Sequence, residues 1–207
     1  LVVKEKKCCG HCSDKLAKAQ DGKKVKAKLI DKKGEQDITV TTPNLTVKVN
    51  RTTGLISEYT YRGKSLLGEG GTLKPNFWRA PTDNDYGASL QKEMRVWKNP
   101  QMNLKSFDKS ESQDSVVLTA IFDMPEVKAQ LELRYRINSE GEVAVTEKMT
   151  TDKEAKVADL FRYGMQLQMP AAFSKLEYYG RGPEENYIDR NHGTPIGRYQ
   201  AKANDLY

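Results

Sequence analysis

The chain is poor in the residues that form disulfides and metal sites. Its 207 residues include three cysteines and two histidines, and Cys8, Cys9 and Cys12 lie together with His11 near the start. A zinc site usually takes two ligand pairs from separated stretches, and the only other histidine of the sequence is His192. Cys9, His11 and Cys12 are therefore weak metal candidates, and we predict no metal site. Residues 37–207 contain no cysteine and carry no signal of a redox compartment.

The chain also lacks a long apolar run. No segment approaches the ~20 apolar residues that span a bilayer, so we predict no membrane partner. The net charge of +6 belongs to residues 1–36, which hold 11 Lys against 5 Asp and Glu, while residues 37–207 sum to zero. A Lys-rich run without Arg or aromatic residues has nothing to stack on bases, so no nucleic-acid partner is predicted. We predict a linker of unknown role at 1–36, dispensable for folding, and one domain at 37–207.

Motifs for nucleophilic catalysis and phosphate binding are missing as well. The sequence contains no Gly-x-Ser-x-Gly and no Gly-rich phosphate loop. Glu184 and Glu185 are adjacent, and neighbouring side chains of a strand point to opposite faces. A retaining glycosidase needs two carboxyl groups about 5–5.5 Å apart that face each other across a sugar, so this pair is a poor catalytic candidate.

Period-two patterns dominate what is present. The clearest one covers 127–137, where Val, Ala, Leu, Leu, Tyr and Ile alternate with Lys, Gln, Glu, Arg and Arg, as in a half-buried antiparallel strand. The apolar run at 116–122 suits a strand buried on both faces. One short helix is expected near 89–98, with Ser89 as its cap and Leu90, Met94 and Trp97 on one stripe. The remaining strands are expected at 38–40, 45–49, 55–61, 142–149, 160–169 and 175–179. This pattern predicts a mostly β, antiparallel sandwich or barrel.

Two motifs are dense in backbone-setting and charged residues. The first runs from Arg79 through Pro81 to Gly87 and contains two carboxylates, Asp83 and Asp85. Its spacing does not match a calcium-binding EF-hand loop. We expect either a loop held by an ion pair between Arg79 and an aspartate, or a loop that faces a substrate.

The second motif lies about ninety residues later. It contains glycines and a proline that favour tight turns, followed by acids, an amide and an arginine that could satisfy one another. We therefore predict a buried polar network that holds the turn. The residues singled out in this motif are Arg181, Gly182, Pro183, Glu185, Asn186, Asp189 and Arg190.

The two motifs, in this order, resemble the C-terminal domain of family 2 glycoside hydrolases of the β-galactosidase type, the small-chain region. The likeness extends to 45–57, 63–67 and 161–170, and so covers nearly all of 37–207. The resemblance implies an antiparallel β super-sandwich related in fold to the galactose mutarotases. It also implies a retaining enzyme whose two catalytic glutamates lie on a TIM barrel encoded upstream. This chain would then be a carbohydrate-binding but non-catalytic part of a hydrolase of carbohydrate metabolism.

The resemblance further implies site residues and partners. It places a mobile active-site loop at Asp83, Asn84, Asp85, Gly87, Ala88 and Ser89 of this sequence, with Gly87 as the hinge. The expected partners are a β-galactoside or galactose, the TIM-barrel domain and further copies in a homo-oligomer. Mg and Na, which such enzymes often use, would bind elsewhere. The family continues beyond the point that corresponds to residue 207, so we expect the C-terminal strands to be lacking. Localisation is open between the bacterial cytoplasm, which we favour, and the periplasm.

Two other function classes stay open. A stand-alone carbohydrate-binding module would present exposed aromatic side chains, and Tyr59, Tyr61, Tyr178 and Tyr179 are available. An epimerase of the mutarotase type would need a pair of histidines with an acid, which His192 alone does not supply.

Overall fold

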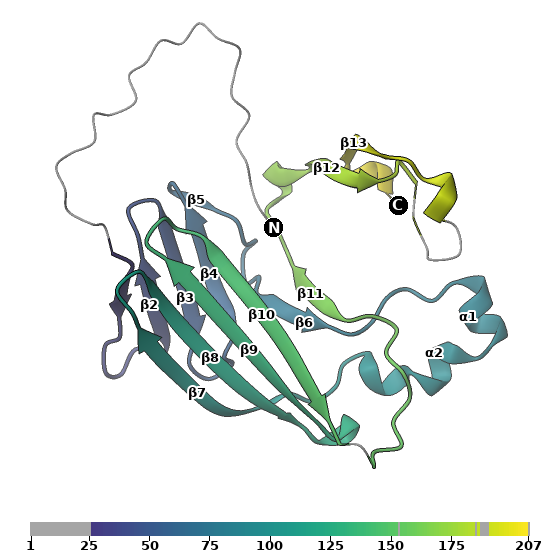
Figure 1. Cartoon of the computed structure of the whole chain (residues 1–207), viewed down its shortest axis with the longest axis horizontal. Helices are drawn as coiled ribbons and strands as arrows, with labels where there is room; N and C mark the ends of the chain where they lie inside the picture. Colours follow the sequence, from purple (N-terminus) through teal and green to yellow (C-terminus); the bar gives the residue numbers. More distant parts are fainter. Residues whose placement is uncertain (1–25, 153, 185, 187–190, 207) are drawn as a thin grey trace, which may run out of the picture.

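The fold is built from two facing antiparallel sheets and a separate hairpin. A computed structural model describes residues 26–152, 154–184, 186 and 191–206. The first sheet has the strand order β1-β2-β3-β4-β6-β11, with β5 paired to β4 (Figure 1). Its strands are β1 (Lys28–Ile30), β2 (Asp37–Thr41), β3 (Leu45–Asn50), β4 (Ile56–Tyr61), β5 (Lys64–Ser65), β6 (Leu73–Asn76) and β11 (Gly164–Leu167).

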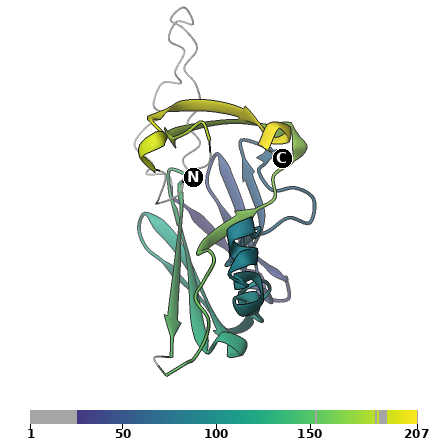
Figure 2. The same ribbon diagram turned by 90° about the vertical axis from the view of Figure 1, so that its right-hand side faces the viewer.

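The second sheet is a four-stranded meander. Its order is β10-β9-β8-β7, formed by β7 (Asn103–Glu111), β8 (Ser115–Met124), β9 (Ala129–Asn138) and β10 (Val143–Thr151). The third sheet is the hairpin of β12 (Lys175–Arg181) and β13 (Ile196–Lys202). A view turned by 90° shows this hairpin lying across one end of the two larger sheets (Figure 2).

Short helices connect the strands. The segment between the two large sheets holds α1 (Asp83–Gly87), α2 (Leu90–Glu93) and the 3-10 turn η1 (Arg95–Trp97). Four more 3-10 turns are found among the described residues: η2 (Pro125–Val127), η3 (Ala171–Phe173) and η4 (Asn191–Gly193) lie in later connections, and η5 (Ala203–Leu206) follows β13. None of the helices in the described part of the chain is long and apolar enough to cross a membrane.

The core lies between the two large sheets because their inner faces carry the alternating apolar residues. Leu45, Val47 and Val49 of β3 are buried, and so are the apolar positions of β9. Burying each such side chain contributes roughly 1.5–3 kcal/mol. At Gly54, in the β3–β4 turn, the backbone carbonyl accepts a hydrogen bond of 3.1 Å from the buried Tyr135 hydroxyl of β9. This bond ties the turn of one sheet to the facing sheet.

The expected mostly β, antiparallel sandwich is confirmed. The alternation at 127–137 appears as β9, with every second residue buried, and neither face of 116–122 in β8 is exposed. Two details differ. The helical stretch starts earlier than 89, at Asp83, and is broken into three short pieces. The strand expected at 160–169 is confined to Gly164–Leu167.

The first sheet also includes a strand ahead of the compositional boundary at residue 36. Lys28–Ile30 pair with Thr39–Thr41 of β2. The carboxylate of Asp31 forms ion pairs with Arg51, in the β3–β4 turn, and with Lys109 of β7 in the second sheet. Residues 28–31 are therefore part of the folded body, although a strand of three residues is too short for its periodicity to be recognised.

Candidate functional site

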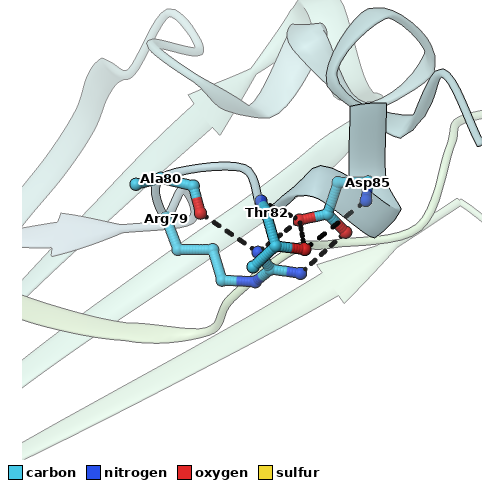
Figure 3. Close-up of polar contacts among 4 residues, drawn as sticks. All are labelled: Arg79, Ala80, Thr82 and Asp85. Carbon is cyan, nitrogen blue, oxygen red and sulfur yellow. Dashed lines mark hydrogen bonds and ion pairs between the residues drawn. The ribbon is translucent and has the colours of Figure 1, made fainter. Parts of the chain in front are cut away.

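The first motif folds into a clamp around Asp85. Thr82 caps α1, because its hydroxyl accepts a hydrogen bond of 3.4 Å from the Asp85 amide while the Asp85 carboxylate accepts one of 2.7 Å from the Thr82 amide. Arg79 donates from Nη1 to Asp85 Oδ2 at 2.5 Å and from Nη2 to Oδ1 at 3.0 Å (Figure 3). Pro81 lies between Arg79 and Asp85 in the sequence. Its ring fixes its own φ and so reduces the number of conformations that the segment between these two residues can adopt. The expected ion pair between Arg79 and an aspartate is thus found, with Asp85 as the partner.

The clamp keeps Asp85 ionised. The residue is 5% exposed, and the pKa of its side chain is lowered from 3.8 to about 2, first by the Arg79 hydrogen bonds and then by the Thr82 amide. A carboxylate that is bound by Arg79 and Thr82 and has so low a pKa is not suited to act as a general acid near neutral pH. Asp85 therefore shapes the segment around α1.

Aromatic side chains support the clamp from the C-terminal half of the chain. The Arg79 guanidinium lies over the Phe161 ring at 4.7 Å, and Phe161 meets Trp78 edge to face with ring centroids 4.7 Å apart. Trp97, in η1, is 3% exposed and donates a hydrogen bond of 2.7 Å from its indole nitrogen to the Ala158 carbonyl. The 155–163 connection thus fixes both ends of the helical segment.

The other residues of the predicted active-site loop lie on the surface of this segment. Asp83, Asn84, Gly87 and Ala88 are exposed, whereas Asp85 points inward. Gly87 ends α1 with an ordinary φ. The left-handed conformation is at Ser89, with φ 60° and ψ 19°, and its side chain makes no capping hydrogen bond to α2. The special backbone position thus lies two residues beyond the predicted hinge.

The second motif closes the end of the β12–β13 hairpin. Arg181 Nη1 donates to the carbonyl oxygens of Asn191, at 2.6 Å, and Thr194, at 3.0 Å. The Thr194 hydroxyl is 3.1 Å from Asn186 Oδ1 and 3.2 Å from the Asn191 carbonyl. Gly182, joined to Pro183 by a cis peptide bond, is packed against Tyr199 so closely that a Cβ would lie 2.8 Å from its ring. Of the predicted network, Asn186 is described and is exposed rather than buried.

Several predicted residues lie outside the described residues. They are Glu185, Asp189 and Arg190 of the second motif and the metal candidates Cys9, His11 and Cys12. Within the described ranges, no three His, Cys, Asp or Glu side chains gather closely enough to hold a metal ion. His192 is exposed in η4.

Sequence reasoning missed two features. One is Glu147 of β10, whose side chain lies on the same face as Val145 and Met149. Burial of this side chain raises its pKa from 4.5 to about 7. Its place in the period-two pattern of 142–149 could have revealed it. The other is a cavity that is lined by Trp78, Lys74 and Arg162, among other residues. No local pattern marks this cavity, because its walls come from segments far apart in the chain.

Comparison with known proteins places the fold in a family. A family model described as the β-galactosidase small chain matches residues 41–207. The β-galactosidase of Priestia megaterium is 30% identical over 173 residues, which are 83% of this chain and 16% of that protein. Those of Lactobacillus delbrueckii subsp. bulgaricus and Streptococcus thermophilus are 35% and 28% identical over 60% and 88% of this chain. The chain spans less than a fifth of the length of each of these three relatives. The chain therefore belongs to the β-galactosidase small-chain family.

Proposed function

We propose that this chain is the non-catalytic sandwich part of a retaining β-galactosidase that hydrolyses terminal β-D-galactosides. The observation that carries the proposal is the family match over 41–207, combined with the small share of each β-galactosidase that the chain covers. In the whole enzyme, the segment 83–89 would complete the sugar-binding cleft, and the sandwich would support contacts with the TIM barrel and with other copies in a homo-oligomer.

The surroundings of the carboxylates in this chain support the proposal that the catalytic pair lies outside it. Asp85 is bound by Arg79, Glu184 is exposed in a turn, and the raised pKa of Glu147 has burial as its one cause, without a contribution from a neighbouring carboxylate. Among the residues that the structure describes, no carboxylate is found facing any of these three in the way that a retaining mechanism needs. In this proposal, the Mg and Na that such enzymes often use would be bound by other parts of the whole enzyme.

The test is an assay with an aryl β-galactoside. We expect no turnover by the purified 207-residue chain, and turnover when it is combined with a separately produced chain that supplies the upstream barrel. A matched sample in which the barrel lacks its catalytic glutamates should stay inactive. Turnover by the 207-residue chain alone, retained after repurification, would contradict the proposal.

A stand-alone carbohydrate-binding module is the second candidate. It is favoured by aromatic exposure on β12, where Tyr179 is 76% and Tyr178 38% exposed. This alternative predicts that the chain alone binds galactose or lactose in calorimetric titrations and that Tyr179→Ala removes the binding. If neither sugar binds, the module function is excluded for these ligands.

A further inference from the structure

The cavity beside Trp78 is assembled by the pairing of β6 with β11. In this ladder Lys74 lies opposite Gln166, and Asn76 lies opposite Gly164. Directly opposite residues of an antiparallel pair point to the same face, so Lys74 and Gln166 project together. Arg162 precedes β11, and Lys98 follows η1. We call the cavity lined by Lys74, Asn76, Trp78, Lys98, Arg162 and Gln166 the Trp78 cleft.

The size of the Trp78 cleft suits a small molecule. Its volume is about 630 Å³, within the range of roughly 300–1,000 Å³ that is typical of ligand sites. Leu55 and Met102 contribute apolar surface to its lining. Trp78 is half-buried and held by the Phe161 ring, so its indole is a fixed wall.

The charge of the Trp78 cleft is strongly one-sided. Lys74, Lys98 and Arg162 line it, and Arg79 lines it too, although its guanidinium is bound to Asp85. No aspartate or glutamate is among the described residues of the lining. Several cations converging on one concavity create a positive potential that attracts an anion. The arginine can bind a carboxylate or a phosphate through two parallel hydrogen bonds.

The remaining polar groups are amides rather than charges. Asn76 Oδ1 accepts a hydrogen bond of 3.3 Å from the Trp78 backbone amide, a bond that does not use the two donors of its Nδ2. Gln166 adds a second side-chain amide, and the Lys98 ammonium lies 6.0 Å from the centre of the Trp78 ring. An aromatic wall flanked by amides matches a ring that has an apolar face and hydroxyl groups on its rim.

We propose that the Trp78 cleft binds an anionic sugar, a pyranose ring that carries a carboxylate or a phosphate. The ring packs against Trp78 with its hydroxyls toward Asn76 and Gln166, and the anion lies between Lys74, Lys98 and Arg162. Binding to the Trp78 cleft requires no hydrolysis.

Calorimetric titration of the 207-residue chain tests the proposal with four probes, namely galacturonate, galactose 6-phosphate, galactose and inorganic phosphate. We expect one-site binding of galacturonate, galactose 6-phosphate or both, and the preferred probe identifies the anion. Arg162→Ala and Lys74→Ala should each weaken that binding about tenfold, the usual result of removing a hydrogen bond to a charged group. Lys105→Ala, at an exposed position of β7, is the matched control and should change the affinity less than about twofold.

The remaining outcomes overturn the proposal. Failure of both anionic sugars to bind shows that the cleft is no such site. Equal affinity for galactose shows that the cations do not select the ligand, and equal affinity for inorganic phosphate shows that the ring is not recognised. A loss with Lys105→Ala as large as with Arg162→Ala indicates non-specific attraction. Far-ultraviolet circular dichroism of each variant separates lost binding from lost folding, and Arg162→Gln, which keeps a polar but uncharged side chain, gives a second test of the same charge. These titrations measure binding and not galactoside hydrolysis, so their result is independent of the proposed function.

Discussion

Asp85 is the residue whose charge contributes most clearly to the local structure. Its pKa is lowered from 3.8 to about 2, so its ionised form stabilises the fold above pH 3.8, and this contribution is lost as the pH falls through 2. We predict that Asp85→Asn lowers the urea midpoint at pH 7 and that the difference from wild type nearly vanishes at pH 2. Chemical denaturation at both pH values measures it.

Asp83→Asn provides the control for this prediction. Asp83 lies in the same turn of α1, but its side chain is exposed. Its replacement should shift the midpoint much less at pH 7. A loss for Asp85→Asn that is equally large at pH 7 and pH 2 would show that the lost stability comes from altered packing rather than from the ion pair.

Glu147 has the opposite pH dependence. Burial raises its pKa from 4.5 to about 7, so the protonated form is favoured in the folded state and the free energy of unfolding falls as the pH rises from 4.5 to 7. We predict that Glu147→Gln stabilises the protein at pH 8 and has little effect at pH 4. Thermal melts of wild type and variant across this range measure the difference. Glu111→Gln, exposed on β7, should show no such trend, and a parallel trend in both variants would contradict the assignment to Glu147.

At the scale of elements, the packing of the β3–β4 turn can be tested by comparing Gly54, which lies in that turn, with Gly63, which lies in the β4–β5 turn. Gly54 and Gly63 both have positive φ, +66° and +75°, but a Cβ at Gly54 would lie 2.9 Å from Ala120 and Phe122, whereas a Cβ at Gly63 would meet nothing within 4 Å. Gly63→Ala should cost about 1–2 kcal/mol of backbone strain. Gly54→Ala should cost the same strain plus about 1–3 kcal/mol of overpacking. Urea denaturation compares the two, and equal losses would mean that the turn does not pack tightly on β8.

The break between α1 and α2 gives a second prediction at this scale. Ser89 has φ 60°, a conformation that costs a residue with a Cβ about 1–2 kcal/mol relative to glycine. We predict that Ser89→Gly raises the melting temperature. Gly87→Ala should be tolerated, since a Cβ there meets nothing within 4 Å. A melting temperature that falls with Gly87→Ala and is unchanged by Ser89→Gly would contradict this prediction.

The sequence predicted the long elements with a clear apolar pattern, but not β7 or β13, which contain few apolar residues. The alternation of β9 and the apolar run of β8 are visible because ten residues repeat one rule. Strands of three or four residues, such as β1 and β6, carry too few repeats, and β6 contains Pro75. The Arg79–Asp85 pair was anticipated from residue types within one motif. The Trp78 cleft was not, because its walls meet only when β11 pairs with β6, and no local pattern encodes that pairing.

For the whole molecule, residues 28–31 contribute to the stability of the fold, although the composition of 1–36 indicates a linker. β1 extends the first sheet, and Asp31 links Arg51 of that sheet to Lys109 of the second. We predict that a chain lacking residues 1–25 keeps the wild-type melting temperature, whereas one lacking residues 1–36 melts at a lower temperature. Differential scanning calorimetry of both chains measures this. Equal stability of the two shortened chains would restore the boundary at residue 36, and destabilisation by the shorter deletion would give residues 1–25 a structural role.

The pairing of β11 with β6 has a consequence for the order of folding. β1 to β4 and β7 to β10 are runs of neighbouring hairpins, which close short loops, whereas β11 reaches β6 only after the whole second sheet has intervened in the chain. Closing so long a loop costs more conformational entropy than closing a hairpin. The β6–β11 contacts offset this cost only after the loop has closed. The two meanders can therefore nucleate separately, and the β6–β11 ladder at one edge of the first sheet forms afterwards. Amide protons of Gly164–Leu167 should then gain protection from hydrogen exchange last during refolding, after those of β8 and β9.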